Sequence, residues 1–415
     1  MDEPIEAGYY EVLKQWEEEG HKRPTSFTEK KSADDFITSD DRQFVAQTES
    51  RGYDMSVYHW KEQHSVTVEI DIEQSGLYEI GFEYYPLSDG IVPIEGALQI
   101  DGEYPFSESR RIEFSTYWQH ASDSFETDRY GNEIIPEQIQ SQEWQYTKAV
   151  DSNQMNARPL QYYFSEGTHE ITLINLREEL LLGSIEVTSV TERLTYDEYR
   201  SQLPEGELVQ DLLTVEAEHP YEKNSSYIRP IATQDPSVYP YDTSNQLLNT
   251  FGGESWTDSG HSVSWKVDVE KSGYYQLTFK AMQNKESHSP VFRQLSINGQ
   301  VPFLEVESYP FLYDEKWVNE TLGNNENEPY LFYLQKGENI ITLTADASPY
   351  QPSLYEMNQM MRRIEEMALS IKQLTGNQQD RSRGWRINEY IPDIEERLVE
   401  WAESLEGHID FFLPH

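Results

Sequence analysis

This 415-residue chain contains an internal duplication that limits the folds it can adopt. Residues 65–84 align with residues 262–281 at a shift of 197 (262 minus 65), and a second block keeps the same shift. A third block aligns residues 159–173 with residues 329–343 at a shift of 170 (329 minus 159), so the first copy holds 27 extra residues (197 minus 170) before that block. A period this long is typical of a duplicated domain rather than of a solenoid.

Both copies carry the sequence pattern of β-strands. Apolar and polar residues alternate over residues 65–72 and again over residues 262–269, so each segment would have one apolar face. Asp101-Gly102 and Asn298-Gly299 lie at matching positions between alternating residues, which favours hairpins because both residues tolerate a positive φ. The pattern predicts a mainly β protein with two tandem antiparallel β-sandwiches of the jelly-roll kind.

The segments outside the duplication have helical patterns. Residues 9–17 form a short amphipathic stretch, and residues 357–374 and 387–405 repeat apolar residues at steps of three and four. Gly376 is a natural C-cap, and Pro392 is tolerated only in a first helical turn. We therefore expect an antiparallel helical hairpin at the C-terminal end. The predicted domains are an N-terminal helix (1–24), a first sandwich with an insertion near 119–150 (25–195), a second sandwich (196–350) and the hairpin (351–415).

Charge and cysteine content exclude several classes of function. The chain has 32 Lys and Arg against 75 Asp and Glu, a net charge of −43, which would repel nucleic acid and anionic membranes. Without cysteine there can be no disulfide, zinc–thiolate site or cysteine nucleophile. No hydrophobic run approaches the length of a membrane span, and the first residues do not form a signal peptide, so a secreted parent would have lost its leader.

Sequence motifs for catalysis are absent. There is no HExxH, GxSxG, phosphate-binding GxxxxGK[ST] or dinucleotide-binding GxGxxG motif. With 75 acidic residues, any pair of carboxylates chosen as a glycosidase centre would be arbitrary. We expect the chain not to be an enzyme.

The chain is instead rich in aromatic residues, with 28 Tyr, 16 Phe and 9 Trp. An aromatic ring can cover the apolar face of a sugar while carboxylates, amides and guanidinium groups bind its hydroxyls. Core packing or packing between domains is the alternative for each ring. The candidate ligand-binding residues are Tyr84, Tyr85, Trp118, Trp144 and Tyr146 in the first copy, and Trp256, Arg293, Tyr309, Tyr313 and Trp317 in the second.

A metal site is suggested just before the second copy. If Leu213-Thr214-Val215-Glu216-Ala217-Glu218 is a strand, Glu216 and Glu218 share one face, where a cation would relieve their repulsion. Asp346 could supply a third oxygen ligand, and oxygen ligands suit calcium. The alternative is that these acids simply face solvent. No cofactor is required, and structural calcium is the one candidate.

These motifs resemble two related protein groups. The EAE segment, the Gly-Tyr-Tyr-x-Leu-x-Phe turn and strand, and the Leu-x-Ile-Asn-Gly hairpin resemble galactose-binding-like carbohydrate-binding modules with a structural calcium. The whole order, from YYEVLKQW through SGLYEIGFEYYPL, DGEYPF, NGQVPF and PYLFYLQKG to the LTG-linked hairpin, resembles the N-terminal region of large extracellular solute-binding lipoproteins of Firmicutes sugar ABC transporters. In that family a bilobal solute-binding domain follows and a lipid-modified cysteine anchors the protein, and this sequence contains neither.

The resemblance and the composition together predict a non-catalytic region, extracellular at a bacterial cell surface, that captures neutral oligo- or polysaccharide for a sugar ABC transporter. Its partners would be the sugar and a downstream solute-binding domain or transporter, with membrane contact only through a lipid anchor. Two alternatives remain open. The chain could be part of a polysaccharide-degrading enzyme, with the insertion roofing paired acids, or a structural spacer and interaction module without sugar affinity, whose C-terminal hairpin docks a partner or a further domain. The spacer alternative predicts an exposed apolar strip along Ile387, Ile394 and Trp401.

Overall fold

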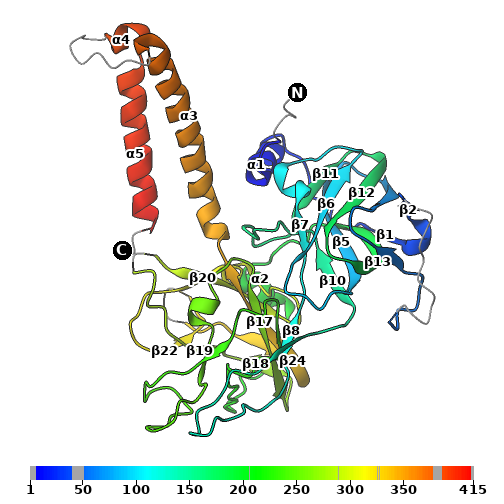
Figure 1. The fold of residues 1–415 in the computed structure, drawn as a ribbon, viewed down its shortest axis with the longest axis vertical. Coiled ribbons are helices and arrows are strands. Elements are labelled where there is room, and N and C mark those ends of the chain that lie inside the picture. The colour runs from blue at the N-terminus through cyan, green and yellow to red at the C-terminus, as the bar shows by residue number, and fades with distance from the viewer. Residues whose placement is uncertain are drawn as a thin grey trace. The chain divides into compact units, whose positions relative to one another are not determined.

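The computed structural model describes residues 6–39, 51–204, 206–287, 289–324, 326, 328–376 and 386–412 (Figure 1). They form two compact units. One contains both β-modules and comprises Met1–Ala281, Phe292–Tyr309 and Trp317–Ser348; the other comprises Met282–Val291, Pro310–Lys316 and Pro349–His415. The chain is mainly β, with antiparallel sheets, a short N-terminal helix and C-terminal helices, which confirms the predicted fold class.

The first module is a sandwich of two antiparallel sheets that follows a short helix, α1 (Tyr9–Glu18). Their apolar faces enclose one core, which includes Trp60, Phe82 and Leu173. The six-stranded sheet contains β1 (Thr28–Ser32), β3 (Tyr58–Trp60), β5 (Gly76–Pro86), β10 (Gln145–Lys148), β11 (Gln161–Phe164) and β13 (Leu180–Ser189). The five-stranded sheet contains β2 (Ile37–Thr38), β4 (Ser65–Ile72), β6 (Ile94–Ile100), β7 (Ile112–Phe114) and β12 (Gly167–Arg177).

The second module repeats this framework at the positions that the sequence shift gives. Strand β17 (Ser262–Val269) starts and ends 197 residues after β4, and β20 (Val291–Ile297) does the same relative to β6. The two predicted turns form as expected: φ is 52° at Asp101 and 82° at Gly102, and 52° at Asn298 and 77° at Gly299. A long sheet runs in the order β21 (Tyr309–Phe311), β20, β24 (Gly337–Asp346), β17, β14 (Glu222–Lys223), β8 (Trp118–His120) and β9 (Gln138–Gln140).

The other sheet is much reduced in the second module. The positions that form the single strand β5 in the first copy form two short strands here, β18 (Gly273–Tyr275) and β19 (Thr278–Ala281). Each has one short antiparallel partner, β23 (Phe332–Leu334) for β18 and β22 (Val318–Thr321) for β19. A further ribbon pairs β15 (Pro230–Ile231) with β16 (Thr250–Phe251). No described strand takes the place of β13, because the chain enters a helix at the corresponding positions.

The insertion of the first module contributes strands to the second. Strands β8 and β9 lie within the extra residues of the first copy, and β8 pairs with β14 at Trp118 and Lys223. Side-chain contacts extend the junction: Asn132 Oδ1 accepts from the backbone N–H of Gln246 at 3.0 Å, and Glu133 Oε2 accepts from that of Leu248 at 2.6 Å. The part of the insertion that contains β8 and β9 therefore belongs to the second module's sheet, whereas β10, near the end of the insertion, pairs with β5 of the first module.

Each module begins with a helix docked in the same way. Helix α2 (Tyr196–Gln202) precedes the second sandwich as α1 precedes the first. The Tyr9 hydroxyl accepts from the backbone N–H of Gln161 at 2.9 Å, and the Tyr196 hydroxyl accepts from that of Leu331 at 2.9 Å, 170 residues further on. The duplication therefore includes the leading helix, which the sequence patterns did not reveal.

A charged cluster joins the two modules. The guanidinium group of Arg158 donates to both carboxylate oxygens of Glu307 at 2.8–3.0 Å, and Arg193 donates to Glu307 at 3.1 Å. Ser259 also donates to the backbone carbonyl of Gln154 at 2.6 Å. The carboxylate of Glu307 is buried, so these bonds replace the water that it lacks.

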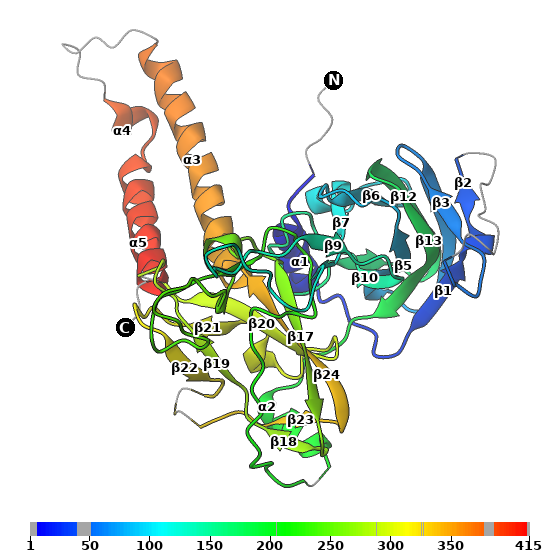
Figure 2. The same cartoon turned by 60° about the horizontal axis from the view of Figure 1, so that its bottom comes forward.

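The C-terminal region forms the predicted helical hairpin from α3 (Gln351–Thr375), α4 (Ile387–Tyr390) and α5 (Ile394–Phe412) (Figure 2). Gly376 ends α3 with a φ of 72°, as a C-cap residue should. Pro392 lies between α4 and α5, so the second predicted helix is divided there. Among the described residues, no helix has the length and apolar character needed to cross a membrane.

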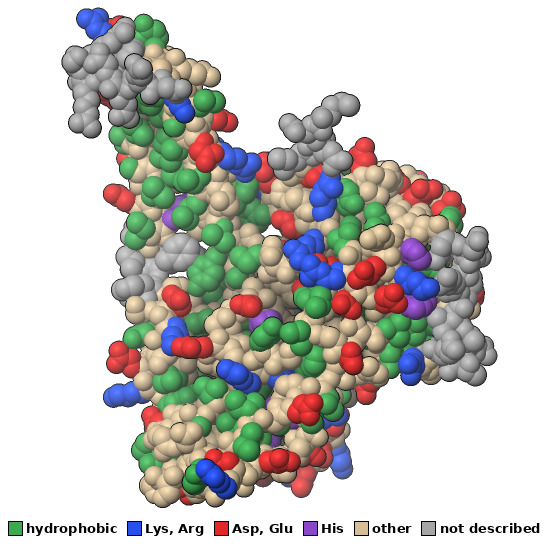
Figure 3. Space-filling model, viewed as in Figure 1, with side chains coloured by type: hydrophobic (Ala, Val, Ile, Leu, Met, Phe, Trp, Pro, Cys, Tyr) green, Lys and Arg blue, Asp and Glu red, His purple; other side chains and the backbone are tan. Residues whose placement is uncertain are grey.

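The exposed apolar strip predicted along Ile387, Ile394 and Trp401 does not form, because Trp401 is buried and Ile387 and Ile394 are only partly exposed. Trp401 is only 6% exposed because it packs with Met360 and Met367 of α3, and Ile394 joins that cluster. Hydrophobic side chains do lie along the surface of the hairpin (Figure 3). The exposed apolar residues of its two long helices are Leu354, Met357, Met361, Ile364, Leu369, Leu398, Val399, Leu405 and Ile409.

Candidate functional site

The alternation of strand β5 divides its side chains between the core and the opposite face of the sheet. Tyr78, Ile80, Phe82 and Tyr84 belong to the core cluster. The residues between them, including Glu83 and Tyr85, therefore lie on the other side. We call this side the outer face; it is formed by Lys30, Tyr53, Gly81, Glu83, Tyr85, Trp144, Tyr146, Lys148, Ser184 and Glu186, by register and contact.

Three aromatic rings gather at one end of the outer face. Tyr53 stacks on Trp144 with 4.2 Å between ring centroids, and Tyr85 lies 5.8 Å from Trp144. The guanidinium carbon of Arg51 lies 5.9 Å from the Tyr85 ring centroid. Gly183 makes room for Tyr53, since a Cβ there would lie 2.7 Å from its ring. Tyr53 and Trp144 are partly exposed, whereas Tyr85 is only 6% exposed and supports them from a buried cluster with Val57 and Leu181.

Tyr146 lies next to this group and is 48% exposed. Its hydroxyl donates to Glu186 Oε1 at 2.5 Å, and its ring covers Gly81, where a Cβ would come 2.5 Å from the hydroxyl oxygen. Burial and the negative charge of Glu186 raise the pKa of the Tyr146 hydroxyl, so it stays a hydrogen-bond donor at neutral pH. The missing side chain at Gly81 therefore sets the position of the ring.

Glu83 is the central carboxylate of the outer face. It accepts from Lys30 at 2.7 Å, from the Ser184 hydroxyl at 2.8 Å and from the Tyr53 hydroxyl. Burial opposes ionisation, but the hydrogen bonds from Lys30, Tyr53 and Ser184 outweigh it and lower the pKa of Glu83. The carboxylate is thus charged and held in one orientation.

This arrangement can bind a polyhydroxylated ligand. Aromatic rings offer apolar surface, while the carboxylates of Glu83 and Glu186 and the ammonium groups of Lys30 and Lys148 offer acceptors and donors. From Trp144 to Lys148 the face extends about 14 Å at ~3.4 Å per residue. That length accommodates more than one sugar ring.

The first-copy candidates do not all reach this face. Trp144 and Tyr146 do, and Tyr85 lies on the same side of the sheet but is only 6% exposed. Tyr84 is instead a core residue with no exposed area, and its hydroxyl donates to the carbonyl of Ser115 at 2.7 Å. Trp118 is only 6% exposed, since it lies in β8 between β14 and β9.

In the second module, Trp256 and Arg293 pack against each other. The guanidinium carbon of Arg293 lies 4.8 Å from the Trp256 ring, and its donors reach the carbonyls of Phe292 (2.9 Å) and Trp256 (3.2 Å). Trp256 Nε1 donates to the carbonyl of His261 at 2.8 Å. Burial lowers the pKa of Arg293 to about 10. These contacts hold both side chains within the module.

The remaining three candidates are separate from that pair. Tyr309 is buried, and its hydroxyl donates to Glu320 at 2.7 Å. Tyr313 is exposed and donates to Glu315 at 3.0 Å. Trp317 is half-buried and directly precedes β22.

The structure does not assemble the predicted metal ligands. Residues 213–218 are not a strand, so the alternation that would pair Glu216 with Glu218 does not apply. The Asp346 carboxylate accepts from the Ser348 backbone N–H at 2.8 Å and from the Ser348 and Ser308 hydroxyls. Within the described part of the chain, no three His, Asp or Glu side chains are grouped so as to hold a metal ion. These residues, as arranged, do not fit calcium.

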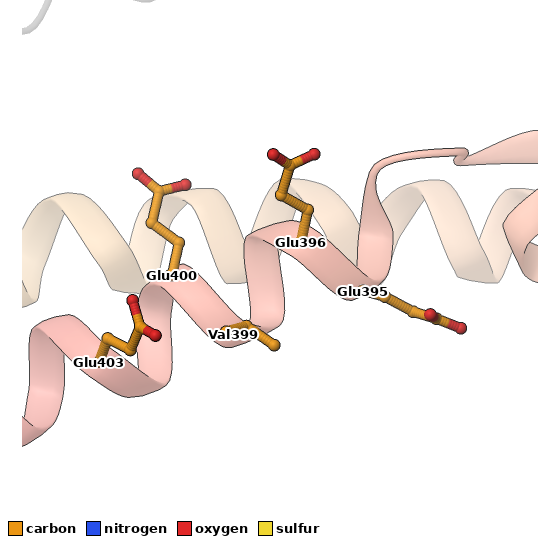
Figure 4. A pocket seen from close by; sticks show the side chains of 5 residues that line it. All are labelled: Glu395, Glu396, Val399, Glu400 and Glu403. Carbon is orange, nitrogen blue, oxygen red and sulfur yellow. The ribbon is translucent and has the colours of Figure 1, made fainter.

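A depression on α5 is lined by Glu395, Glu396, Val399, Glu400 and Glu403. Figure 4 shows that Glu396 and Glu400 point to the same side of this one helix. The lining of this depression has no aromatic ring and no cation, so the depression lacks the groups that bind sugars.

Sequence reasoning missed Tyr53, Glu83 and Glu186. Tyr53 precedes the first strand of the repeat, and no local pattern assigns it to the sheet. Glu83 was detectable, because the alternation that places Phe82 and Tyr84 in the core places their neighbours outside. Glu186 is opposite Gly81 in the register of β13 and β5, which a single sequence does not reveal.

Solved structures with similarity to this chain include carbohydrate-binding proteins. A family 35 carbohydrate-binding module from Clostridium thermocellum has 10% identity and a TM-score of 0.24, covering 40% of this chain and 99% of its own. The C-terminal family 6 module of a laminarinase from Zobellia galactanivorans has 15% identity and a TM-score of 0.24, covering 39% and 100%. A Paenibacillus xanthan lyase has 12% identity and a TM-score of 0.23, covering 78% and 25%. At these scores the similarity says nothing about ligands.

Sequence comparison gives a family for the C-terminal hairpin. No curated protein matches the chain. Residues 352–411, which contain α3, α4 and nearly all of α5, match the family described as bacterial solute-binding protein, 4-helix bundle domain.

Proposed function

We propose that the first module is a non-catalytic carbohydrate-binding module whose outer face captures neutral oligo- or polysaccharide. The observation that carries this proposal is the convergence of Tyr53, Tyr85, Trp144 and Tyr146 beside the oriented carboxylate of Glu83. Rings held on a sheet lose little conformational entropy on binding, and the fixed carboxylates accept hydroxyl hydrogen bonds.

The charges of the outer face favour a neutral sugar. Lys30 and Lys148 are each paired with a carboxylate, at 2.7 Å from Glu83 and 2.5 Å from Glu79, and Glu186 adds a further negative charge. A uronate or sulfated sugar would meet repulsion from these groups and from the net charge of −43. The ligand would be bound by stacking and hydroxyl hydrogen bonds.

The family match of the hairpin supports a role with a solute-binding protein. In this proposal the protein is extracellular, at a bacterial cell surface, where the module would concentrate sugar for a sugar ABC transporter. Such a module needs only moderate affinity, because tethering a ligand near its acceptor raises the effective concentration.

The test is isothermal titration calorimetry of the whole chain against neutral plant and bacterial oligosaccharides. We expect Trp144→Ala to weaken binding about tenfold, because an aromatic pair contributes ~0.5–1.5 kcal/mol beyond its buried area. Gly81→Ala should weaken binding as well, although it removes no ligand-contacting group, because its Cβ displaces Tyr146.

Tyr130→Ala is the matched control, since Tyr130 is 67% exposed on the insertion and is not part of the outer face. Unchanged affinity in both Trp144→Ala and Gly81→Ala would show that the outer face is not the binding site. Absence of heat with every glycan would overturn the proposed function.

A further inference from the structure

The second module has a counterpart of the outer face. Strand β19 pairs with β22 in the register in which β5 pairs with β10; β19 follows β5 at a shift of 197 (280 minus 83) and β22 follows β10 at a shift of 173 (319 minus 146). The pair Glu83–Tyr146 in the first module corresponds to the pair Lys280–Asn319 in the second. Figure 2 shows β19 and β22 side by side.

An aromatic residue holds the same place in both modules. Trp144 directly precedes β10, and Trp317 directly precedes β22. Because residues two apart on an extended strand share a face, Trp317 belongs with Asn319, as Trp144 belongs with Tyr146. Trp317 is half-buried, which leaves part of its ring accessible.

Charge is what differs between the two faces. Lys280 replaces the carboxylate of Glu83, and Asn319 replaces the ring of Tyr146. Lys280 and Asn319 are both exposed. Among the described residues, no carboxylate forms an ion pair with Lys280, although Asp235 is near enough for its pKa to be lowered in part by Lys280. The exposed ammonium group can therefore approach an anion.

Polar groups continue this face beyond the lysine. Thr278 and Thr321 lie opposite each other, and their hydroxyls are 2.8 Å apart. The strands that supply Lys30, Ser184 and Glu186 in the first module have no described counterpart beside β19. A carboxylated ligand would therefore meet a cation, an amide and two hydroxyls without the carboxylates of the first face.

We propose that the face formed by Thr278, Lys280, Trp317, Asn319 and Thr321 is a second sugar site that takes an anionic sugar, a uronic acid unit of an oligosaccharide. This rests on the proposed function, because it treats the two faces as variants of one sugar-binding design. Lys280 binds the carboxylate, Asn319 binds the carboxylate or an adjacent hydroxyl, and Trp317 stacks on the pyranose ring.

The acidic surface of the protein sets the conditions for this binding. A net charge of −43 repels an anion at long range, while the pair with Lys280 acts at contact. At an ionic strength of 0.15 M the Debye length is about 8 Å, so distant carboxylates are largely screened. The measurement belongs at that ionic strength.

The experiment titrates the whole chain by calorimetry with two probes, an oligogalacturonate and a neutral oligosaccharide that the parent protein binds. We expect Lys280→Glu to weaken oligogalacturonate binding at least about tenfold, because hydrogen bonds to charged groups contribute ~1.5–3 kcal/mol. Trp317→Ala should weaken it by up to about tenfold, because it removes the ring that stacks on the sugar. Lys280→Arg should keep most of the affinity. Lys336→Glu is the control, since it makes the same charge change at another exposed lysine.

The outcomes separate the two sites. The inference is supported if Trp144→Ala weakens binding of the neutral oligosaccharide but not of oligogalacturonate. It also requires that Lys280→Glu weaken binding of oligogalacturonate but not of the neutral oligosaccharide. Neutral binding without oligogalacturonate binding overturns the inference and leaves the proposed function standing. Loss of both ligands in Trp144→Ala alone also overturns it, because one site would then serve both. Thermal unfolding of each variant shows whether lost binding reflects lost folding.

Discussion

In the first module, strand β5 runs unbroken through eleven residues between β13 and β10, whereas in the second the same positions form two short strands, and no strand of the described residues corresponds to β13. In the other sheet, β4, β6, β7 and β12 are kept almost residue for residue as β17, β20, β21 and β24, and so are the turns. The duplication has thus preserved one sheet as scaffold and altered the other. The altered sheet is the one that carries both proposed sugar sites.

The largest expected effect tests whether the preserved parts are equivalent. Phe106 and Phe303 lie 197 residues apart, and both are fully buried. Each packs on a tyrosine of its module's leading helix, with ring centroids 4.8 Å apart for Tyr9–Phe106 and 4.9 Å for Tyr196–Phe303. We expect either Phe→Ala change to lower the free energy of unfolding by about 3–5 kcal/mol.

Urea denaturation followed by tryptophan fluorescence measures both changes. Costs that agree within about 1 kcal/mol would support a shared scaffold, given the usual scatter of such substitutions. If Phe303→Ala lowers the free energy of unfolding far less than Phe106→Ala does, the core of the second module is more loosely packed. The two modules would then differ in their cores as well as in their sheet faces.

A smaller effect is expected at the junction of the modules. Glu307 accepts hydrogen bonds from Arg158 and Arg193. Glu307→Gln leaves both cations without their carboxylate, and we expect a loss of about 1.5–3 kcal/mol, typical of hydrogen bonds to charged groups. Differential scanning calorimetry gives the cost and shows whether a single transition divides into two. Glu315→Gln, at an exposed position on another segment, is the control.

The smallest expected effect is on pH dependence, and we follow it at one acid with a raised pKa in each module, Glu113 and Glu218. Burial, with Glu216 and Glu133 nearby, raises the pKa of Glu218 from 4.5 to about 7, and burial beside Glu95 raises that of Glu113 to about 7. The folded protein keeps a proton that the unfolded chain loses above pH 4.5. The stabilisation by these protons is complete below pH 4.5 and is lost as the pH rises through 7.

Glu218→Gln and Glu113→Gln should each flatten part of this dependence, because the amide does not ionise. The measurement is the melting temperature of the parent and of each variant at intervals between pH 4.5 and pH 8. A parent whose melting temperature falls no more steeply than that of either variant would contradict the raised pKa values.

Local patterns predicted the parts of the fold that depend on neighbouring residues. The alternation in residues 65–72, the turns at Asp101-Gly102 and Asn298-Gly299, and the helix α3 all appear in the structure, although the buried methionines of α3, Met360 and Met367, lie outside the predicted spacing. Each is determined by side-chain period or by allowed φ, so sequence alone is sufficient.

Non-local pairing explains what the sequence patterns missed. The spacing of apolar residues in α5 shows which ones share a face, but only packing on α3 shows that Trp401 is covered and Leu398 is not. Residues 213–218 alternate like a strand and yet have no partner strand in the structure. For the site, composition indicated Trp144 and Tyr146, whereas Glu186 required the register between two distant strands.

The strands β8 and β9 mean that the unit of duplication and the unit of folding do not coincide. A cut after residue 195, where the sequence divides most naturally, would leave the second module without two strands of its sheet and would leave those strands on a fragment that has no sheet for them. The exposed edge of β14 would then be open to pairing with other chains, as unprotected sheet edges are. Either module expressed alone would therefore lack part of its structure. Both modules together are the smallest part of this chain in which β8, β9 and β14 all have their partner strands.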